Sequence, residues 1–281
     1  MQISAVLITL NEERRLPRAL ESLRPVADEI LVVDSGSTDR TREIAQSHGA
    51  RFLSHPWEGY SRQKNFAASQ AKFDWILSLD ADEVVTPELA AELRVIQEQG
   101  PGAAAGFRMP RLAFYRGRWI RHSGWYPDHK LRLYDRRRAR WVGDYVHERV
   151  EAASGTDAKM SATIRTLRGD LQHFTCDSLA EHFRTTDRYT TLAAQEACAH
   201  SKIKHRSTGR ILSLALAMTL AGPPWKFFET YLLRQGFRDG IAGLIIAGMA
   251  GYYVHEKYAK LWRLARGHAP DTEAQRSQRN S

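Results

Sequence analysis

Hydrophobic and polar positions follow two alternating periods over the first hundred residues. Short, β-branched apolar runs at 3–9, 29–34, 51–53 and 75–79 predict buried strands. The segments between them carry apolar residues at three- to four-residue spacing, which is typical of amphipathic helices, and Pro87 opens a further helix at the position that proline favours. Strands that alternate with short helices predict right-handed βαβ units and a mostly parallel sheet, an α/β fold.

The pattern changes from about Gly106. Strand candidates at 106–115, 130–134, 141–142 and 165–174 are separated by turn-like and aromatic segments, so this part is expected to be β-rich and less regular. Helical spacing then returns from Ser178 to His200. We therefore predict an α/β domain over residues 1–200, a helical extension over 201–266 and a disordered polar tail over 267–281.

Two apolar runs lie in the helical extension. Ile211–Trp225 contains fifteen uncharged residues and Ile241–Val254 contains fourteen, both short of the ~20 that cross a ~30 Å hydrocarbon core. The Pro223-Pro224 pair is expected to break the first run. Basic residues flank both runs: Lys202, Lys204, Arg206, Arg210, Lys257, Lys260, Arg263 and Arg266. The pattern predicts that the two runs form an interfacial or re-entrant hairpin on an anionic membrane. The alternative is that they form a helical layer that completes the core of a soluble protein, or a contact between two copies in a homodimer.

Composition and charge narrow the class of protein. Of the 281 residues, 43% are hydrophobic and 26% are charged, which excludes a disordered, collagen-like or coiled-coil chain. The net charge of +9 divides into −5 for residues 1–100, +6 for 101–200 and +8 for 201–281. Basic charge alone fits nucleic acid, an anionic membrane or an anionic substrate. Cys176 and Cys198 form no disulfide framework and indicate a reducing compartment, and no signal peptide is expected at the N-terminus.

Acidic residues follow three of the predicted parallel strands, at the sheet edge where open α/β sheets bind ligands. Glu12 follows the first strand, Asp34 ends the second, and Asp80 and Asp82 follow the fourth. Two carboxylates two residues apart repel unless a cation screens them, and a hard divalent cation on substrate phosphates takes one or two such oxygens. Asp39 is expected to cap a helix. The absence of a Gly-x-Gly-x-x-Gly or Walker-type loop disfavours dinucleotide and P-loop sites.

Four motifs in this region resemble those of the family 2 glycosyltransferases, nucleotide-sugar enzymes of the GT-A fold. They are T-L-N-E-E, V-V-D-S-G-S-T-D, Q-K-N-F-A and D-A-D-E, in family order and spacing. Further along, W-Y-P-D-H-K-L-R-L-Y, V-H-E-R-V and Y-L-L-R-Q-G-F-R-D-G-I-A-G resemble the branch that adds glucose to the inner core of bacterial lipopolysaccharide. The resemblance implies a nucleotide-sugar half at 1–100 and an acceptor half at 101–175.

The resemblance also implies roles for individual residues. Asp34 would accept a hydrogen bond from the uracil ring, and Glu12 would lie beside the nucleoside. Lys64 would face the diphosphate, with a solvated helix face as the structural alternative. Asp80 would lie near the ribose and the metal, and Asp82 would bind Mg²⁺ or Mn²⁺ across the diphosphate. Such a metal neutralises the charge that develops on departing UDP.

Family 2 enzymes usually invert the anomeric carbon, which requires a carboxylate to take the proton of the acceptor hydroxyl. Glu148 is the first candidate for this base, Asp128 the second and Asp144 the third. An ion pair with Arg149 or a neighbouring arginine is the structural alternative for Glu148. His147 would orient the base or fill a structural role.

Three further residues have possible roles at the same site. His173 would complete the metal shell, although core packing is the stronger expectation, and Lys130 and Arg132 alternate on one strand face and would grip phosphate.

The leading prediction is therefore an inverting, metal-dependent transfer of a hexose from a UDP-sugar to a lipid-linked saccharide, at the cytoplasmic face of the inner membrane. Transfer to a polyprenyl phosphate, whose anionic acceptor needs no base, is one alternative. A non-catalytic membrane- or nucleic-acid-binding protein on a degenerate scaffold is another, although the motifs favour no nucleic-acid partner. The sequence leaves the oligomeric state, the sugar and the linkage open.

Overall fold

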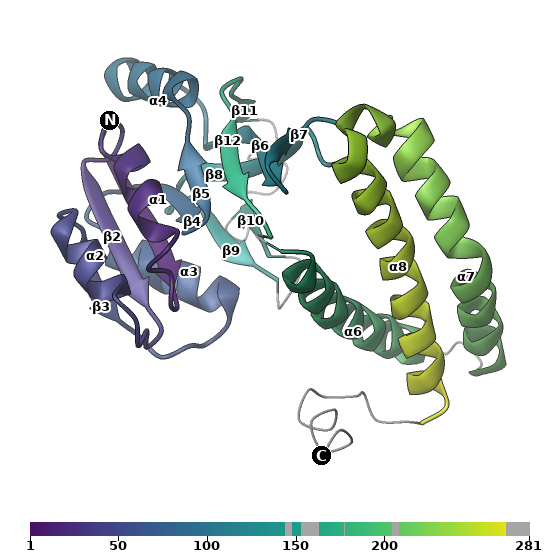
Figure 1. Ribbon diagram of the computed structural model, residues 1–281. Helices are drawn as coiled ribbons and strands as arrows, with labels where there is room; N and C mark the ends of the chain where they lie inside the picture. Colours follow the sequence, from purple (N-terminus) through teal and green to yellow (C-terminus); the bar gives the residue numbers. More distant parts are fainter. Residues whose placement is uncertain (144–147, 153–162, 177, 204–207, 268–281) are drawn as a thin grey trace. The chain divides into compact units, whose positions relative to one another are not determined.

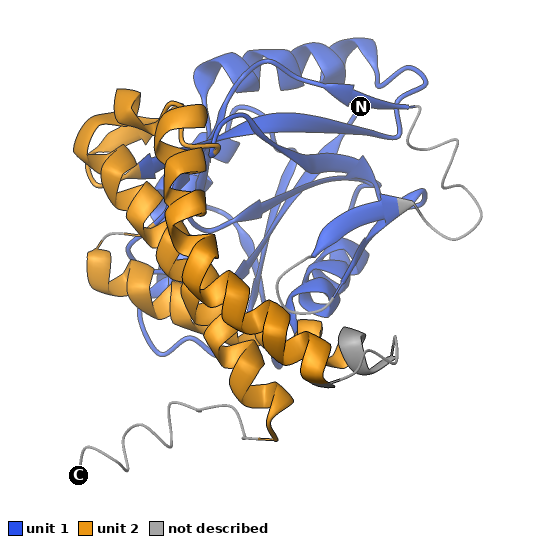
Figure 2. Cartoon of the chain, turned by 90° about the vertical axis from the view of Figure 1, so that its right-hand side faces the viewer, with its two compact units in different colours: residues 1–114, 125–175 blue, residues 115–124, 176–281 orange. Residues whose placement is uncertain are grey.

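The computed structural model describes residues 1–143, 148–152, 163–176, 178–203 and 208–267 (Figure 1). The chain divides into two compact units (Figure 2). Unit 1 comprises residues 1–114 and 125–175, and unit 2 comprises 115–124 and 176–281. The helix after Ser178, which we grouped with the α/β domain, thus clusters with the C-terminal helices. The predicted tail at 267–281 lies, except for Gly267, outside the described residues.

Unit 1 begins with the predicted alternation of strands and helices. The elements are β1 Ile3–Thr9, α1 Leu16–Leu23, β2 Glu29–Asp34, α2 Thr41–Ser47, β3 Arg51–Ser54, α3 Tyr60–Gln70, β4 Trp75–Asp80 and α4 Pro87–Gln99. The strands pair in parallel in the order β3-β2-β1-β4, with Val6 opposite Leu31 on one side and Ser78 on the other. The Thr86 hydroxyl accepts from Leu89 N at 3.2 Å and caps α4. The predicted α/β fold is confirmed here.

The second half of unit 1 extends this sheet with mixed pairing. The added strands are β5 Glu83–Val85, β6 Gly106–Tyr115, β8 Asp128–Asp135, β11 Ile164–Thr166 and β12 Leu171–Phe174. Strand β8 pairs antiparallel with both β4 and β6, and β12 lies between β6 and β5. A separate ribbon pairs β9 Ala139–Val142 with β10 Arg149–Ala152. The single strand expected at 165–174 is therefore two short strands joined by a turn.

Side chains of β1 and β4 alternate between the two faces of the sheet. Leu7 and Leu77 pack into the core on one face, while Val6 and Ile76 pack on the other. Strands buried on both faces read as continuous apolar runs, which is why the sequence pattern located them. The carboxyl ends of β1, β2 and β4 all open at one edge of this sheet.

Unit 2 is almost entirely helical. It contains the short strand β7 Arg118–Ile120, α6 Leu179–Ile203, α7 Thr208–Phe228, a π-helical turn η1 Glu229–Leu233, a 3-10 turn η2 Gly236–Asp239 and α8 Gly240–Ala265. Helices α7 and α8 lie side by side, and Cys198, Ala215 and Leu261 form a small core between α6, α7 and α8. The predicted helical extension is confirmed.

The R-D-G-I-A-G part of the C-terminal motif builds a tight junction at the start of α8. Asp239, 2% exposed, accepts hydrogen bonds from the backbone of Arg121 and His122 and from the Ser123 hydroxyl. A Cβ on Gly243 would lie 1.8 Å from the Gly236 carbonyl oxygen, so only glycine fits there. This motif therefore anchors the segment 121–123 to α8.

The expectation that Pro223-Pro224 breaks the first apolar run is wrong, because α7 continues through both prolines. Proline has no N–H, so Pro223 leaves the Thr219 carbonyl without its helical donor. His255 Nδ1 of α8 lies 3.3 Å from that oxygen and supplies a replacement. The expected sub-spanning length is also wrong for this segment. Within the described residues, Gly209–Leu233 is helical over 25 residues and is long and apolar enough to cross a membrane.

Candidate active site

The loops after β1 and β2 are held together by hydrogen bonds between their side chains and backbone. Asn11, at a φ of 56°, accepts from Thr38 N at 2.9 Å, and its own N–H donates to Ser37 Oγ at 2.7 Å. Asp39 accepts from the backbone and hydroxyl of Thr41 at the start of α2, where Arg40 holds the N-cap position. Asp39 thus stabilises the start of the helix without being its N-cap residue.

Asp34 lies at the end of β2 and is 3% exposed. Its Oδ1 accepts from the backbone of Gly36 and Ser37 at 2.9 and 2.8 Å, and its Oδ2 accepts from the hydroxyls of Thr9 and Ser37. These four bonds use the acceptor sites of the carboxylate. Asp34 therefore shapes the loop around the expected nucleoside position, and its contact with uracil stays a prediction.

Glu12 has a carboxyl group whose pKa is raised well above its usual range. Its pKa is raised to about 7, chiefly by burial; Arg15 opposes this rise, while the nearby charges of Asp82, Asp39 and Asp80 add to it. Burial disfavours the charged form of Glu12, and the neighbouring carboxylates add to this effect; a bound cation would relieve both. The structure thus brings Glu12, Asp80 and Asp82 together, as the sequence predicts.

Asp80 lies between two cations. Its Oδ1 is 2.9 Å from Lys64 Nζ, and its Oδ2 is 2.6 Å from Arg132 Nη2. Burial disfavours the charge of Asp80, but Arg132 and Lys64 outweigh burial and hold its pKa well below the usual range. Arg132 is also 2.6 Å from Glu83, which is fully buried. Asp80 is therefore ionised and fixed in orientation, and Arg132 grips carboxylates in place of the expected phosphate.

Lys64 joins Asp80 to the predicted base. Its Nζ lies 3.3 Å from Glu148 Oε1 and 4.3 Å from the centre of the Trp141 ring, and its side chain is only 3% exposed. The alternative of a solvated helix face is wrong for Lys64. Glu148, at 20% exposure, pairs with this lysine, while Arg149 pairs with Glu151. The structure thus brings Lys64, Asp80 and Glu148 together.

Asp128, the second candidate for the base, is engaged elsewhere. It lies 2.7 Å from Arg111 and 3.1 Å from Lys130. Burial raises its pKa, but these two cations outweigh burial and lower it. A carboxylate bound to two cations is a weak proton acceptor. Asp144 and His147, the other residues considered for this step, lie outside the described residues.

Asp82 lies beside His173, with 3.3 Å between Oδ2 and Nε2. Strand β12 carries His173 opposite Glu83 of β5, and Phe174 N donates to the Asp82 carbonyl at 2.9 Å. His173 is thus half-buried at the site edge, where its ring is available to a ligand as well as to packing. No group of three or more His, Cys, Asp or Glu side chains positioned for a metal occurs in the part of the chain that the structure describes. Asp82 and His173 still fit Mg²⁺ or Mn²⁺, because such ions take their other ligands from phosphate and water.

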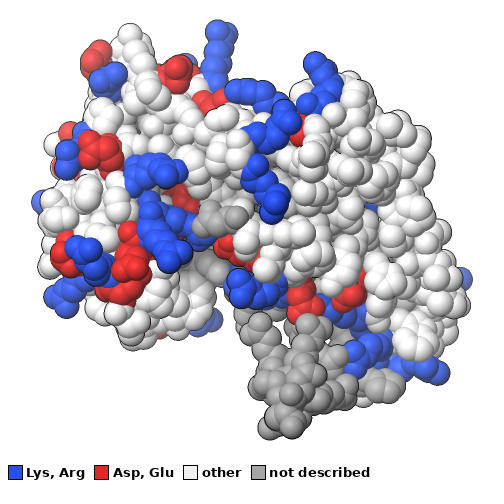
Figure 3. Space-filling view, viewed as in Figure 1, with Lys and Arg blue, Asp and Glu red and all other residues white. Residues whose placement is uncertain are grey.

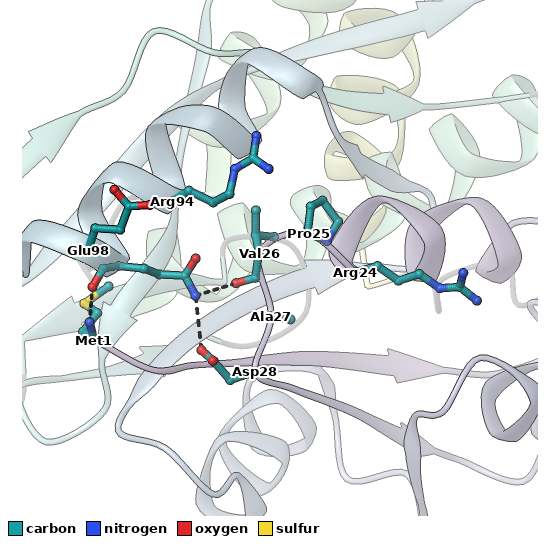
Figure 4. Close-up of a pocket in the computed structure, with 9 residues that line it drawn as sticks. Met1, Arg24, Pro25, Val26, Ala27, Asp28, Arg94 and Glu98 are labelled. Carbon is teal, nitrogen blue, oxygen red and sulfur yellow. Dashed lines mark hydrogen bonds between the residues drawn. The ribbon is translucent and has the colours of Figure 1, made fainter.

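A separate pocket lies at the opposite edge of unit 1 (Figure 4). It is lined by Met1, Arg24, Pro25, Val26, Ala27, Asp28, Arg94, Gln97 and Glu98. The side-chain amide nitrogen of Gln97 donates to Val26 O and Asp28 Oδ2, both at 3.1 Å. Both hydrogens of this amide group are therefore used within the protein. The pocket contains none of the predicted site residues. It lies at the start of β1, away from the carboxyl ends of the strands where those residues lie.

Sequence reasoning missed the buried part of the site. The sequence pattern identifies Glu83 only as part of the D-A-D-E motif. It predicts that Arg132 binds phosphate together with Lys130, because the two residues alternate on one strand face. The signal for their pairing was a charged residue inside an otherwise apolar strand, L-R-L-Y, which requires a buried partner.

The mostly parallel sheet of unit 1, with carboxylates at the ends of β1, β2 and β4, is an α/β fold of the GT-A type. The chain belongs to glycosyl transferase family 2, whose family model matches residues 4–164.

Relatives extend this similarity over nearly the full chain. The lipopolysaccharide core biosynthesis glycosyltransferase LpsC of Rhizobium meliloti is 30% identical over 94% of this chain and 93% of its own. An uncharacterized glycosyltransferase of Rickettsia bellii is 31% identical over 98% and 90%.

Two solved structures are also similar. TarS 1-349 of S. aureus has a TM-score of 0.44 at 13% identity and covers 96% of this chain and 93% of its own. Glucosyl-3-phosphoglycerate synthase of Mycobacterium tuberculosis, in complex with Mn²⁺, UDP-glucose and phosphoglyceric acid, has a TM-score of 0.34 at 26% identity and covers 39% and 43%.

Proposed function

We propose that this glycosyltransferase moves a hexose, with glucose as the first candidate, from a UDP-sugar to a lipid-linked saccharide such as the inner core of lipopolysaccharide, with inversion. The observation that carries the proposal is the joint placement of Glu12, Asp80, Asp82 and Glu148, with Lys64 between Asp80 and Glu148. The similarity to LpsC supports the class of acceptor.

The donor end of the site is formed by the carboxylates of Glu12, Asp80 and Asp82, at the carboxyl ends of β1 and β4. Asp82, with His173 at 3.3 Å, would hold Mg²⁺ or Mn²⁺. The metal would neutralise charge on the diphosphate of the leaving UDP. Lys64 and Arg132 keep Asp80 ionised and fixed, so that its carboxylate is ready to accept from a ribose hydroxyl.

The acceptor end of the site is Glu148. In a single displacement, the acceptor oxygen forms its bond to the anomeric carbon as the bond to the UDP oxygen breaks, and the hydroxyl proton passes to the Glu148 carboxylate. Lys64 holds this carboxylate 3.3 Å from its ammonium group. Glu148 is favoured over Asp128 because Asp128 is held by both Arg111 and Lys130.

A panel of nucleotide sugars tests the proposal. Purified protein is incubated with each donor, Mg²⁺ or Mn²⁺, and either a lipopolysaccharide core lacking its outer sugars or a polyprenyl phosphate, and the products are identified by mass. The proposal predicts metal-dependent transfer from a UDP-hexose to the saccharide. Transfer to polyprenyl phosphate that survives Glu148→Gln would contradict it, because an anionic acceptor needs no base. Glu88→Gln, at an exposed glutamate of α4, is the matched control.

A further inference from the structure

From Ser213 to Phe228, helix α7 has an exposed face without a charged side chain. Between residues 213 and 228 the exposed positions recur every three to four residues, as expected of one side of a helix. They are Ser213, Leu214, Leu216, Ala217, Leu220, Ala221, Pro224, Trp225 and Phe228, here called the α7 stripe. Leu220 is 69% exposed and Trp225 is 61% exposed. At 1.5 Å per residue the stripe is about 22 Å long, which is unusual for a surface facing water.

The other side of α7 packs closely on α8. A Cβ on Gly222 would lie 2.6 Å from a Val254 methyl group, and one on Gly251 would lie 3.0 Å from the Pro223 carbonyl oxygen. Small residues on both helices thus allow their backbones to approach. Because α8 occupies that side, the α7 stripe is the face that stays open.

The apolar surface continues around the end of the α7/α8 pair. Leu232, Leu233, Phe237, Ile241 and Leu244 are each at least 45% exposed, and Ile241 reaches 78%. Basic side chains border it, with Arg234 and Arg238 exposed at this end and Arg210 exposed near the start of α7. The space-filling view shows a broad uncharged area over these helices, with charged side chains of both signs along its lower margin (Figure 3). An apolar face bordered by cations complements an anionic lipid surface.

The length of α7 would allow it to cross a bilayer, but its partner α8 argues against that arrangement. Thr219, near the middle of the 25-residue apolar segment, lies against His255 of α8, which precedes Glu256 and Lys257. Lys260, one turn further, is 2.7 Å from Asp187 of α6. If α7 crossed the membrane, these charges would lie near the bilayer centre, which is strongly unfavourable.

We propose that α7 lies along one leaflet of an anionic membrane, with the α7 stripe in the boundary between headgroups and acyl chains. Leu214, Leu216 and Leu220 insert, and Trp225 sits at the interface. Arg210, Arg234 and Arg238 contact anionic headgroups. The inference rests on unit 2 alone and goes beyond the proposed sugar transfer.

Flotation with vesicles of phosphatidylcholine and phosphatidylglycerol, without donor or acceptor, tests the binding. The double variant Leu216→Ser/Leu220→Ser is expected to lower the partition coefficient on the order of tenfold for each leucine. Val95→Ser is the matched control, because Val95 is 47% exposed on α4 of unit 1, and it is expected to bind as the wild type does. Equal flotation of the double variant and the wild type overturns the proposal. Circular dichroism and UDP binding confirm that each variant is folded.

Cysteine labelling separates an in-plane helix from a crossing one. In a Cys176→Ser/Cys198→Ala background, single cysteines replace Gly209 and Gln235, exposed residues at the start of the apolar segment and just past its end, outside the apolar surface. The protein is added to preformed vesicles, followed by a membrane-impermeant maleimide. An in-plane α7 reacts at both positions, and protection of one end alone overturns the proposal. It is also overturned if the protein does not float and instead forms a dimer in solution that Leu216→Ser/Leu220→Ser dissociates.

Discussion

The two units depart from the usual distribution of side chains in opposite directions. Unit 1 buries charges, since Lys64, Glu83 and Arg132 are all less than 5% exposed. Unit 2 exposes large apolar residues, with Leu220 and Trp225 more than half accessible. Buried charge is costly unless it is paired, and exposed leucine is costly unless something covers it. We therefore connect each departure with a proposed function, which is sugar-transfer chemistry in unit 1 and membrane attachment in unit 2.

The largest expected effect is on the chemistry of unit 1. Glu148→Gln removes the proposed proton acceptor and is expected to lower kcat about 10²- to 10⁴-fold, with little change in UDP affinity. Steady-state kinetics and calorimetry with UDP measure the two quantities. Glu151→Gln is the control, because Glu151 is 43% exposed and pairs only with Arg149 among the described ion pairs. A Glu148→Gln enzyme with normal kcat would remove Glu148 from the mechanism.

The next effect tests whether the buried charges stabilise one another. Arg132→Met leaves Glu83 and Asp80 without their shared partner and is expected to cost about 3–5 kcal/mol in the free energy of unfolding. Arg137→Met, at a 62% exposed arginine that also pairs with two carboxylates, is expected to cost less than about 1 kcal/mol. Urea unfolding measures both losses in unfolding free energy. Equal losses would show that the buried ion pairs of Arg132 stabilise the fold no more than the exposed ion pairs of Arg137 do.

A smaller effect is expected at the nucleoside loop. Asp34→Ala removes a buried carboxylate and its four hydrogen bonds, so UDP affinity is expected to fall by about 1.5–3 kcal/mol. Calorimetry with UDP measures the change. An unchanged dissociation constant would place the uracil ring away from Asp34.

The smallest effect concerns pH. The folded pKa of Glu12, about 7, lies above its unfolded value, so the folded protein binds more protons than the unfolded chain between the two values. Stability is therefore expected to fall as pH rises from about 4.5 to about 7, by on the order of 1–2 kcal/mol after allowance for a partly exposed side chain. Glu12→Gln removes this decrease, which urea unfolding across that pH range measures. An identical pH profile for Glu12→Gln would contradict the carboxylate cluster.

The local pattern of apolar and polar residues was sufficient to predict the strands and the carboxylate positions in the first half of unit 1. The strands at 3–9, 29–34 and 75–79 are continuous apolar runs, so their burial and the carboxylates at their ends followed directly from the sequence. Contacts between charged side chains far apart in the chain could not be predicted from this local pattern. The contact of Asp82 with His173 and that of Glu83 with Arg132 join segments far apart in the chain, and nothing in the local pattern specifies which charges meet.

The prolines of α7 show the same limit. Proline disfavours a helix interior because it removes one backbone hydrogen bond and its ring clashes with the preceding turn. Here His255, from a helix more than thirty residues later, lies 3.3 Å from the Thr219 carbonyl, and α7 continues. The helix is therefore longer than the sequence predicted, and the proposed membrane arrangement depends on the charges of α8 and not on the length of α7.

The central claim is that the carboxylates of unit 1 carry out metal-dependent sugar transfer. The most direct measurement compares transfer from UDP-glucose to a lipid-linked saccharide by the wild type and by Asp82→Asn, with and without Mg²⁺ or Mn²⁺, at matched thermal stability. The account predicts transfer that a chelator abolishes in the wild type and that is lost in Asp82→Asn at every metal concentration. Normal turnover by Asp82→Asn with added metal would contradict it.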